Sequence, residues 1–310
     1  MQHRTRVRAP WEVGHAQPAL VQRLQEGRLT GPLLDVGCGT GEFSLLASEQ
    51  GLDVVGIDQD AARLDRARTQ AAAWGLSAVF VQHDAQALAA LPSVLAPAGP
   101  PDGRFGTVVD SLHLHALGSQ SRQLYVAALS TVLVAKGRLV LLSYADDQAG
   151  VPHGVSRAAI TEVFAGWEVE TLDAVRVNTL VHVDGARGWC AVLIAPTWRT
   201  AFGTVPTDSP DRYLRQLTDH VGAIAVRPSA AGDAHQGHVE SRHALAVTRS
   251  ERTATVTSST GTCALIVVSS GLRLELSAAS AEGLDALRAL LTHRLETIGR
   301  RDGLTVQWRS

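Results

Sequence analysis

The chain has 310 residues, 45% of them hydrophobic, which is enough for one large domain or two ordinary ones. Its 28 basic and 30 acidic residues give a net charge of −2, which argues against a surface built for nucleic acid or for anionic membranes. There is no apolar run of transmembrane length and no signal-peptide core in the first thirty residues, so we expect a cytoplasmic protein with no membrane partner. Three well-separated cysteines are too few for a disulfide scaffold or a cysteine-based metal site.

The first two hundred residues alternate short apolar runs with longer helical stretches. Buried strands are expected at residues 33–36, 54–57, 78–82, 107–111 and 138–143. Helices are expected at residues 43–49, 61–74 and 122–134. This alternation indicates βαβ units, and therefore an α/β fold with a Rossmann-like, doubly wound and mostly parallel sheet. Ser156 is expected to cap a helix over 157–164, and strands at 168–175 and 190–195 should complete the sheet as an antiparallel edge.

A second, smaller domain is predicted after residues 196–210, where Thr, Pro and Gly accumulate and periodicity is lost. We therefore expect domains at 1–198 and 204–310. In the second domain the sequence predicts helices at 210–221 and 281–299, and strands at 238–243, 244–249, 253–258, 262–268, 272–278 and 304–308. This α+β domain shows no chemical cluster, so we expect it to help close the substrate pocket or to form a homodimer.

The strongest functional signal is a glycine-rich turn that follows the first strand and opens a helix. Gly37, Gly39 and Gly41 permit positive φ angles and close approach of the backbone to a ligand. The helix behind them presents unpaired N–H groups at its first turn. Asp58 ends the second strand, where a carboxylate can accept hydrogen bonds from both hydroxyls of a ribose.

Two cofactors use this arrangement, and the residues around the turn discriminate between them. A dinucleotide fingerprint needs its third glycine at position 42, where this chain has Glu42. Asp35, two residues before the first glycine, suits the ammonium and sulfonium of S-adenosylmethionine (SAM) better than a pyrophosphate. An NAD-dependent oxidoreductase is therefore disfavoured.

Residues 33–42 resemble motif I of the class I SAM-dependent methyltransferases, and later stretches match that family in order. Residues 80–85 resemble its third-strand motif, whose acidic residue, Asp84 here, binds the adenine amino group. Residues 105–111 resemble its fourth-strand motif beside the methyl donor, and residues 134–138 are a variant of its Pro-Gly-Gly turn. The resemblance implies a SAM site made by Asp35, Gly37, Gly39, Thr40, Gly41, Asp58, Gln59, Asp84, Ala85, Asp110 and Ser111.

Two further resemblances concern the ends of the chain. Residues 10–18 resemble the start of the thiopurine and tellurite-resistance type of small-molecule methyltransferases, in which the residues equivalent to Trp11 and Gln17 help close the SAM pocket. The alternative is that Trp11 only packs a helix on the sheet. Residues 204–309 resemble a small bacterial domain family of unknown function, which implies a fold and no chemistry.

Methyl transfer to a nucleophile that carries a proton needs a base, and histidine is the ordinary choice. His115 and His113 directly follow the fourth strand, at the sheet edge where ligands bind, and the resembling proteins commonly have a histidine at the position of His115. Tyr144 ends strand five and His153 lies in the loop after it, so both are candidates for the substrate pocket. The alternative for each is a packing or solvated role without chemistry.

No metal site is expected, because His235, His238 and His243 straddle a glycine-rich turn without a Cys or acidic partner in register. The loops around the expected pocket carry few charges, which favours a neutral, heteroaromatic substrate. The sequence thus predicts a SAM-dependent methyltransferase of a small, indole-type metabolite, methylated on carbon or nitrogen with a histidine base. O- or S-methylation of another small molecule, and a non-catalytic SAM-binding or interaction protein, are the alternatives.

Overall fold

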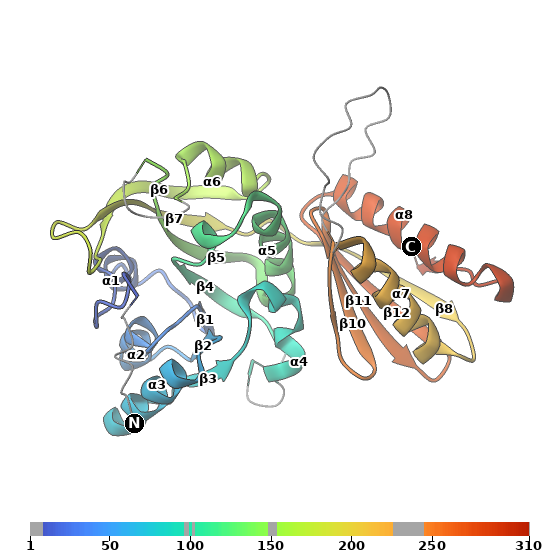
Figure 1. Ribbon diagram of the computed structural model, residues 1–310, viewed down its shortest axis with the longest axis horizontal. Helices are drawn as coiled ribbons and strands as arrows, with labels where there is room; N and C mark the ends of the chain where they lie inside the picture. The colour runs from blue at the N-terminus through green and yellow to red at the C-terminus, as the bar shows by residue number, and fades with distance from the viewer. Residues whose placement is uncertain (1–8, 96–98, 101–102, 148–153, 226–244, 310) are drawn as a thin grey trace, which may run out of the picture. The chain divides into compact units, whose positions relative to one another are not determined.

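The computed structural model describes residues 9–95, 99–100, 103–147, 154–225 and 245–309 (Figure 1). By its internal contacts the chain divides into two units. The second unit comprises the chain from Thr197 onward together with two earlier segments, Gln86–Val94 and Ser119–Val132. The sequence analysis assigned these two segments to the first domain. The domain limits 1–198 and 204–310 stay a prediction.

The first unit contains a seven-stranded sheet with the strand order β3-β2-β1-β4-β5-β7-β6. Its strands are β1 (Leu33–Val36), β2 (Val54–Asp58), β3 (Val79–Gln82), β4 (Phe105–Ser111), β5 (Leu133–Tyr144), β6 (Glu168–Val177) and β7 (Ala186–Ile194). β1 to β5 pair in parallel, whereas β7 runs antiparallel to both β5 and β6. This confirms the Rossmann-like, mostly parallel sheet with an antiparallel edge.

Helices α1 (Pro18–Gln25), α2 (Glu42–Glu49) and α3 (Ala61–Trp74) lie on one side of this sheet in Figure 1. The remaining helical segments between the strands are η1 (Ala85–Ala90), α4 (Leu91–Leu95), η2 (Leu114–Ala116), α5 (Ser119–Val132) and α6 (Arg157–Val163). Their ends follow local sequence signals. Asp60 caps α3 by accepting hydrogen bonds from two backbone N–H groups, Gly75 ends it at φ +67°, and Ser156 caps α6 as predicted.

The core of the first unit fixes the edge of the sheet that carries the site. Leu33, Val109 and Val140 from β1, β4 and β5 pack with apolar residues of α1 and α2 in one buried cluster. Because parallel strands share their direction, the carboxyl ends of β1, β2 and β4 meet at one edge, and the turns that follow them face one another.

The second unit has a six-stranded sheet with the order β13-β8-β12-β11-β10-β9, in which every pairing is antiparallel. Its strands are β8 (Arg199–Pro206), β9 (Leu245–Arg249), β10 (Thr253–Ser258), β11 (Gly261–Val268), β12 (Gly271–Ala278) and β13 (Gln307–Arg309). Its helices are α7 (Pro210–Ala225), α8 (Ala281–Ile298) and the short η3 (Arg300–Asp302). Leu287, Leu291 and Leu295 of α8 are buried in the core of this unit.

Strand β8 lies inside the segment 196–210 that the sequence analysis took as a loss of structure. Its inward positions are Ala201, Gly203 and Val205, which pair into the sheet beside β12. A Cβ at Gly203 would come within 2.7 Å of the Trp308 ring, so a small residue is needed there. Small inward residues weaken the alternation of apolar and polar side chains by which a strand is recognised.

Several expectations for the second unit fall on other residues or outside the described ones. The last strand begins at Gln307 rather than at position 304. The strand expected at 238–243, and with it His235, His238 and His243, lies outside the described residues. Within the described ranges, no helix is long and apolar enough to cross a membrane, and no three His, Cys, Asp or Glu side chains gather to hold a metal ion.

Candidate active site

A pocket of about 310 Å³ opens in the first unit at the carboxyl ends of β1, β2 and β4. One wall is the glycine-rich turn, a second is the turn after β4, and a third is the N-terminal segment Ala9–Gln17, here called the cap segment. The predicted site residues that line this pocket are Trp11, Gln17, Asp35, Gly37, Gly39, Thr40, Asp58, Ser111, His113 and His115.

The other predicted site residues lie outside this lining. They are Gly41, Gln59, Asp84, Ala85, Asp110 and Tyr144. Gly41 has a packing role, because a Cβ there would lie only 2.9 Å from Ala67 and 3.0 Å from Phe80. His153 lies outside the described residues.

The glycine-rich turn leaves room for a ligand against its backbone. Gly37 and Gly39 have φ angles of +71° and +58°, and a Cβ added to either would meet no atom within 4 Å. The turn is held by the backbone of β2, since the N–H groups of Gly37 and Cys38 donate to the carbonyl of Ile57 at 2.8 and 2.9 Å. Its open side faces the pocket, which fits a cofactor that must lie close to the main chain.

Asp35 places an unpaired carboxylate oxygen in this pocket. The residue is 1% exposed, and its Oδ2 accepts a hydrogen bond of 2.6 Å from Ser44, whereas Oδ1 is buried and has no partner among the residues that the structure describes. Burial raises the pKa of Asp35 to about 7, although the bond from Ser44 acts in the opposite direction. A cationic ligand group would satisfy Oδ1 and favour the ionised form, so Asp35 fits the ammonium or sulfonium of SAM.

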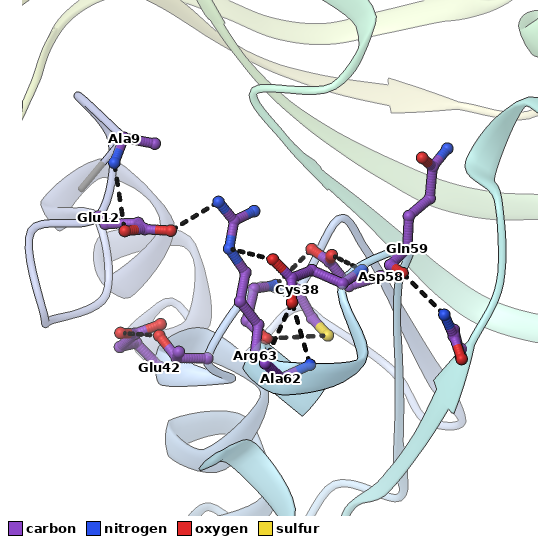
Figure 2. Close-up of polar contacts among 12 residues, drawn as sticks. Ala9, Glu12, Cys38, Glu42, Asp58, Gln59, Ala62 and Arg63 are labelled. Carbon is purple, nitrogen blue, oxygen red and sulfur yellow. Dashed lines mark hydrogen bonds and ion pairs between the residues drawn. The ribbon is translucent and has the colours of Figure 1, made fainter. Parts of the chain in front are cut away.

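Asp58, at the end of β2, is oriented by two backbone groups. Its Oδ2 accepts from the N–H of Gly39 at 3.0 Å, and its Oδ1 accepts from the N–H of Asp60 at 2.8 Å. Figure 2 shows this carboxylate beside the turn and the start of α3. A carboxylate oxygen has more than one acceptor site, so these bonds leave acceptor capacity for ribose hydroxyls.

The turn after β4 brings two histidines to the pocket. Leu112 adopts φ +69°, and the next N–H groups, of His113 and Leu114, both donate to Oδ1 of Asp110 at 2.8 and 3.2 Å. Asp110 is fully buried and therefore shapes the turn rather than the pocket surface. A non-glycine residue with positive φ is uncommon and often marks a functional site.

His115 is almost fully buried and its ring meets that of Tyr144 edge-on, with ring centroids 4.9 Å apart. The Tyr144 hydroxyl is buried and has no hydrogen-bond partner among the described residues. Burial also raises the pKa of Tyr144 to about 12, so the phenol stays protonated at neutral pH. Tyr144 therefore supports His115 by packing and does not itself supply a base.

The cap segment contains both residues expected to close the pocket and others that sequence reasoning missed. Trp11 is 44% exposed at the pocket, and the buried Gln17 side chain bonds to the backbone N–H and carbonyl of Asn178 at 2.8 and 3.0 Å. Glu12, His15 and, from α3, Arg63 also line the pocket, although the sequence analysis assigned none of them a role. Glu12 and Arg63 form an ion pair of 2.6 Å. The two residues are far apart in the sequence, so no local sequence pattern predicts this contact.

Residues 33–137 match the family model described as a methyltransferase domain. The N-terminal part of this chain is a SAM-dependent methyltransferase. Residues 203–309 match a second family, described as an uncharacterized protein conserved in bacteria (DUF2218). The methyltransferase match confirms the class I resemblance and SAM as cofactor, and it removes both the NAD-dependent and the non-catalytic alternatives.

Proteins similar to this chain include a curated methyltransferase and solved structures. The chain is 27% identical over 177 residues to the 2-heptyl-1-hydroxyquinolin-4(1H)-one methyltransferase of Mycobacteroides abscessus, covering 55% of this chain and 73% of that protein. A structure solved in work on the conversion of a disulfide bond into a thioacetal group during echinomycin biosynthesis is 29% identical. It has a TM-score of 0.52 and covers 61% of this chain and 85% of that one. The SAM-bound magnesium protoporphyrin IX methyltransferase of Synechocystis PCC 6803 is 18% identical, with a TM-score of 0.42 and coverage of 56% and 75%.

Proposed function

We propose that this methyltransferase methylates a small nitrogen heteroaromatic metabolite and that His115 is the base. The observation that carries the proposal is one pocket that contains both the glycine-rich turn with Asp35 and the two histidines after β4. In the proposal, the donor side and the proton-accepting side of the reaction share this cavity of about 310 Å³.

The residues of the pocket divide into those that hold the donor and those that face the acceptor. SAM supplies an electrophilic methyl group on a sulfonium. In the proposal, Asp58 accepts hydrogen bonds from the ribose, and Gly37 and Gly39 allow the donor to lie on the main chain. Asp35 pairs with a cationic group of the donor. Each of these contacts orients the methyl group for in-line displacement, in which alignment supplies much of the rate.

His115 takes the proton that the acceptor atom loses. The bond from the acceptor to the methyl carbon forms as the carbon–sulfur bond breaks, and the neutral thioether leaves with that electron pair. The proton of the acceptor passes to an imidazole nitrogen and then to solvent. The Tyr144 ring contact fixes the position of the imidazole, and the Asp110 bonds fix the turn that carries it.

The pocket and the relatives both support the proposed substrate class. Trp11, Phe43 and Leu112 in the pocket lining offer apolar surface to a flat aromatic ring. The relative from M. abscessus is named for a hydroxyquinolinone, which is a nitrogen heteroaromatic bearing a hydroxyl group. An oxygen substituent on the ring is therefore a third acceptor atom to be tested, in addition to carbon and nitrogen.

A sulfur acceptor is the second candidate. It is favoured by the structure from the thioacetal work, because that chemistry concerns a disulfide. A thiol also carries a proton, so the same base would serve it.

The test is turnover with SAM and a panel of hydroxyquinolinones, indoles and thiols. We expect the demethylated donor to appear together with a product heavier by one methylene for a nitrogen heteroaromatic, and nuclear magnetic resonance of the product identifies the methylated atom. Methylation of thiols alone would favour the second candidate and overturn the first.

A further inference from the structure

The cap segment arches across the pocket and is bonded at both ends to the connection between β6 and β7. The backbone N–H of Leu180 donates to the carbonyl of Pro10 at 2.8 Å. At the other end, the buried Gln17 side chain makes its two bonds to the backbone of Asn178. Both ends of the cap segment are thus bonded to the same connection between two strands.

Between these two anchors, Glu12 ties the cap segment to Arg63 of α3, which also lines the pocket. One oxygen of the Glu12 carboxylate lies 2.6 Å from the Arg63 guanidinium, and the other accepts the backbone N–H of Ala9 at 3.2 Å. Figure 2 shows the Glu12 carboxylate pointing at Arg63 from the cap segment. The bond from Ala9 holds the carboxylate in this orientation, so the ion pair spans the pocket between two separately anchored elements.

Arg63 also connects the cap segment to the residues that we expect to bind ribose. Its Nε lies 3.7 Å from the Asp60 carboxylate. The backbone N–H of Asp60 donates to Asp58, which in turn accepts from Gly39. A continuous series of contacts therefore leads from Glu12 to the carboxylate and the glycine turn of the donor site.

The charged residues of the pocket lining leave Glu12 with a single basic partner. Among the described residues that line the pocket, the acids are Glu12, Asp35, Glu42 and Asp58, whereas Arg63 is the one arginine or lysine. The side chains of Glu12 and Arg63 are 23% and 21% exposed, so the pair is partly shielded from water yet remains within its reach. Such a pair is strong enough to bias a segment and weak enough to open repeatedly.

We propose that the Glu12–Arg63 ion pair is a latch that holds the cap segment over bound SAM and must open for the demethylated donor to leave. The proposal rests on the proposed function in that it requires SAM in this pocket. Glu12 and Arg63 are positioning residues, because they act through the cap segment and not on the reacting atoms.

The test is the dissociation rate of SAM, measured by rapid mixing with a displacing ligand, for Glu12→Gln, Arg63→Gln and the double variant. We expect either single change to accelerate dissociation about fivefold, which corresponds to about 1 kcal/mol. The double variant should dissociate no faster than the singles, because the same contact is lost in all three. KM for SAM should rise while kcat stays level or increases.

The matched control is Asp65→Asn, which removes a carboxylate from the same helix. Asp65 is 74% exposed and pairs with Arg68, so this change should leave SAM dissociation unaltered. In the unmodified enzyme, raising the salt concentration should accelerate dissociation, whereas Glu12→Gln should respond less.

Two outcomes overturn the latch: single variants that release SAM at the original rate, or additive effects in the double variant. Thermal unfolding of the variants identifies any that misfold. If the variants misfold, the effect of salt on SAM dissociation from the unmodified enzyme tests the latch by itself. Failure of SAM to bind the unmodified enzyme at all would instead reject the proposed function.

Discussion

The imidazole of His115 and the phenol ring of Tyr144 meet edge-on, with ring centroids 4.9 Å apart and ring planes at 83°. The contact joins the turn after β4 to the end of β5, so two neighbouring strands of the parallel sheet together set the position of the histidine. Aromatic edge-to-face contacts of this kind are worth about 0.5–1.5 kcal/mol beyond the area that they bury. The ring of Tyr144, rather than its hydroxyl, is therefore the part that matters for His115.

Tyr144→Phe tests this division. The hydroxyl is buried without a hydrogen-bond partner among the described residues, and an unsatisfied buried hydroxyl costs free energy in the folded state. We expect the free energy of unfolding to stay level or to rise by about 1 kcal/mol, with kcat near that of the unmodified enzyme. Urea unfolding and initial rates measure both. A large loss of kcat in a stable Tyr144→Phe variant would show that the hydroxyl contacts the substrate.

Asp35 predicts a pH dependence of folding stability. Its pKa is about 7 in the folded chain because of burial, against an ordinary value of 3.8. Between these values the folded state holds more protons than the unfolded state, so the contribution of Asp35 to the free energy of unfolding falls as the pH rises. Asp35→Asn should therefore gain stability relative to the unmodified protein from pH 5 to pH 8, by about 3 kcal/mol. Urea unfolding of the two proteins across this range gives the difference, and a constant difference would contradict the assignment.

The same carboxyl predicts the pH dependence of SAM binding. A cation beside Asp35 binds the ionised form better, so SAM affinity should increase as the pH rises from 5.5 to 7. Calorimetry should find this increase in the unmodified enzyme and a weaker, nearly flat affinity in Asp35→Asn. Parallel curves for the two proteins would place the donor's cationic groups away from Asp35.

Asp58→Ala should weaken SAM binding by about 2–3 kcal/mol, since it removes the charged acceptor of the ribose hydroxyls. In the structure, the Asp58 carboxylate also accepts hydrogen bonds from the backbone N–H groups of Gly39 and Asp60. Asp58→Asn, whose single side-chain oxygen can still accept one of these two bonds, should accordingly bind SAM better than Asp58→Ala. Calorimetry of both variants checks the order, and unchanged affinity in Asp58→Ala would remove it from the site.

Gly39 and Gly41 should respond differently to alanine. At Gly41 a Cβ would collide with Ala67 and Phe80, so Gly41→Ala should lower the unfolding temperature strongly. At Gly39 a Cβ meets no protein atom, and the backbone at φ +58° costs about 1–2 kcal/mol. Gly39→Ala should fold but bind SAM poorly, because the Cβ occupies space open to the pocket. Thermal unfolding and SAM calorimetry on both variants separate packing from binding.

The sheet was accessible to sequence reasoning because its signals are local, and the residues predicted to hold the donor come from the same local pattern. The apolar run ending at Val36, the glycines after it and Asp58 after the next strand lie within one βαβ unit, whose geometry is stereotyped. β8 was missed because two of its three inward residues, Ala201 and Gly203, are small. A Cβ at Gly203 would come within 2.7 Å of the ring of Trp308, about a hundred residues later. Glu12 and Arg63 were missed for a related reason, since only the folded chain brings the cap segment to α3.

The identity of the base is the remaining prediction, and three histidines of the pocket compete for it: His15, His113 and His115. His15 has Nδ1 at 3.0 Å from the carbonyl of Ala16, so that nitrogen must carry the hydrogen and Nε2 is left as an acceptor. His15 belongs to the exposed cap segment, however, whereas His115 is buried at the end of β4 and held by Tyr144. A base that acts in the transition state needs a fixed position, which favours His115.

Single alanine variants of the three histidines decide between them when kcat and SAM affinity are measured together. His115→Ala and His115→Asn should lower kcat by about 10²–10⁴-fold, the usual range for loss of a general base, with SAM affinity nearly unchanged. His113→Ala and His15→Ala should lose less. The profile of kcat against pH adds a readout that packing alone would not move, because the fall in kcat at low pH, where imidazoles protonate, should disappear in His115→Asn. If His15→Ala shows the larger loss and removes this dependence, the base is delivered by the cap segment. If no single variant falls by more than a few fold, the substrate loses its proton without a histidine, and the alignment imposed by the glycine turn, Asp35 and Asp58 carries the rate.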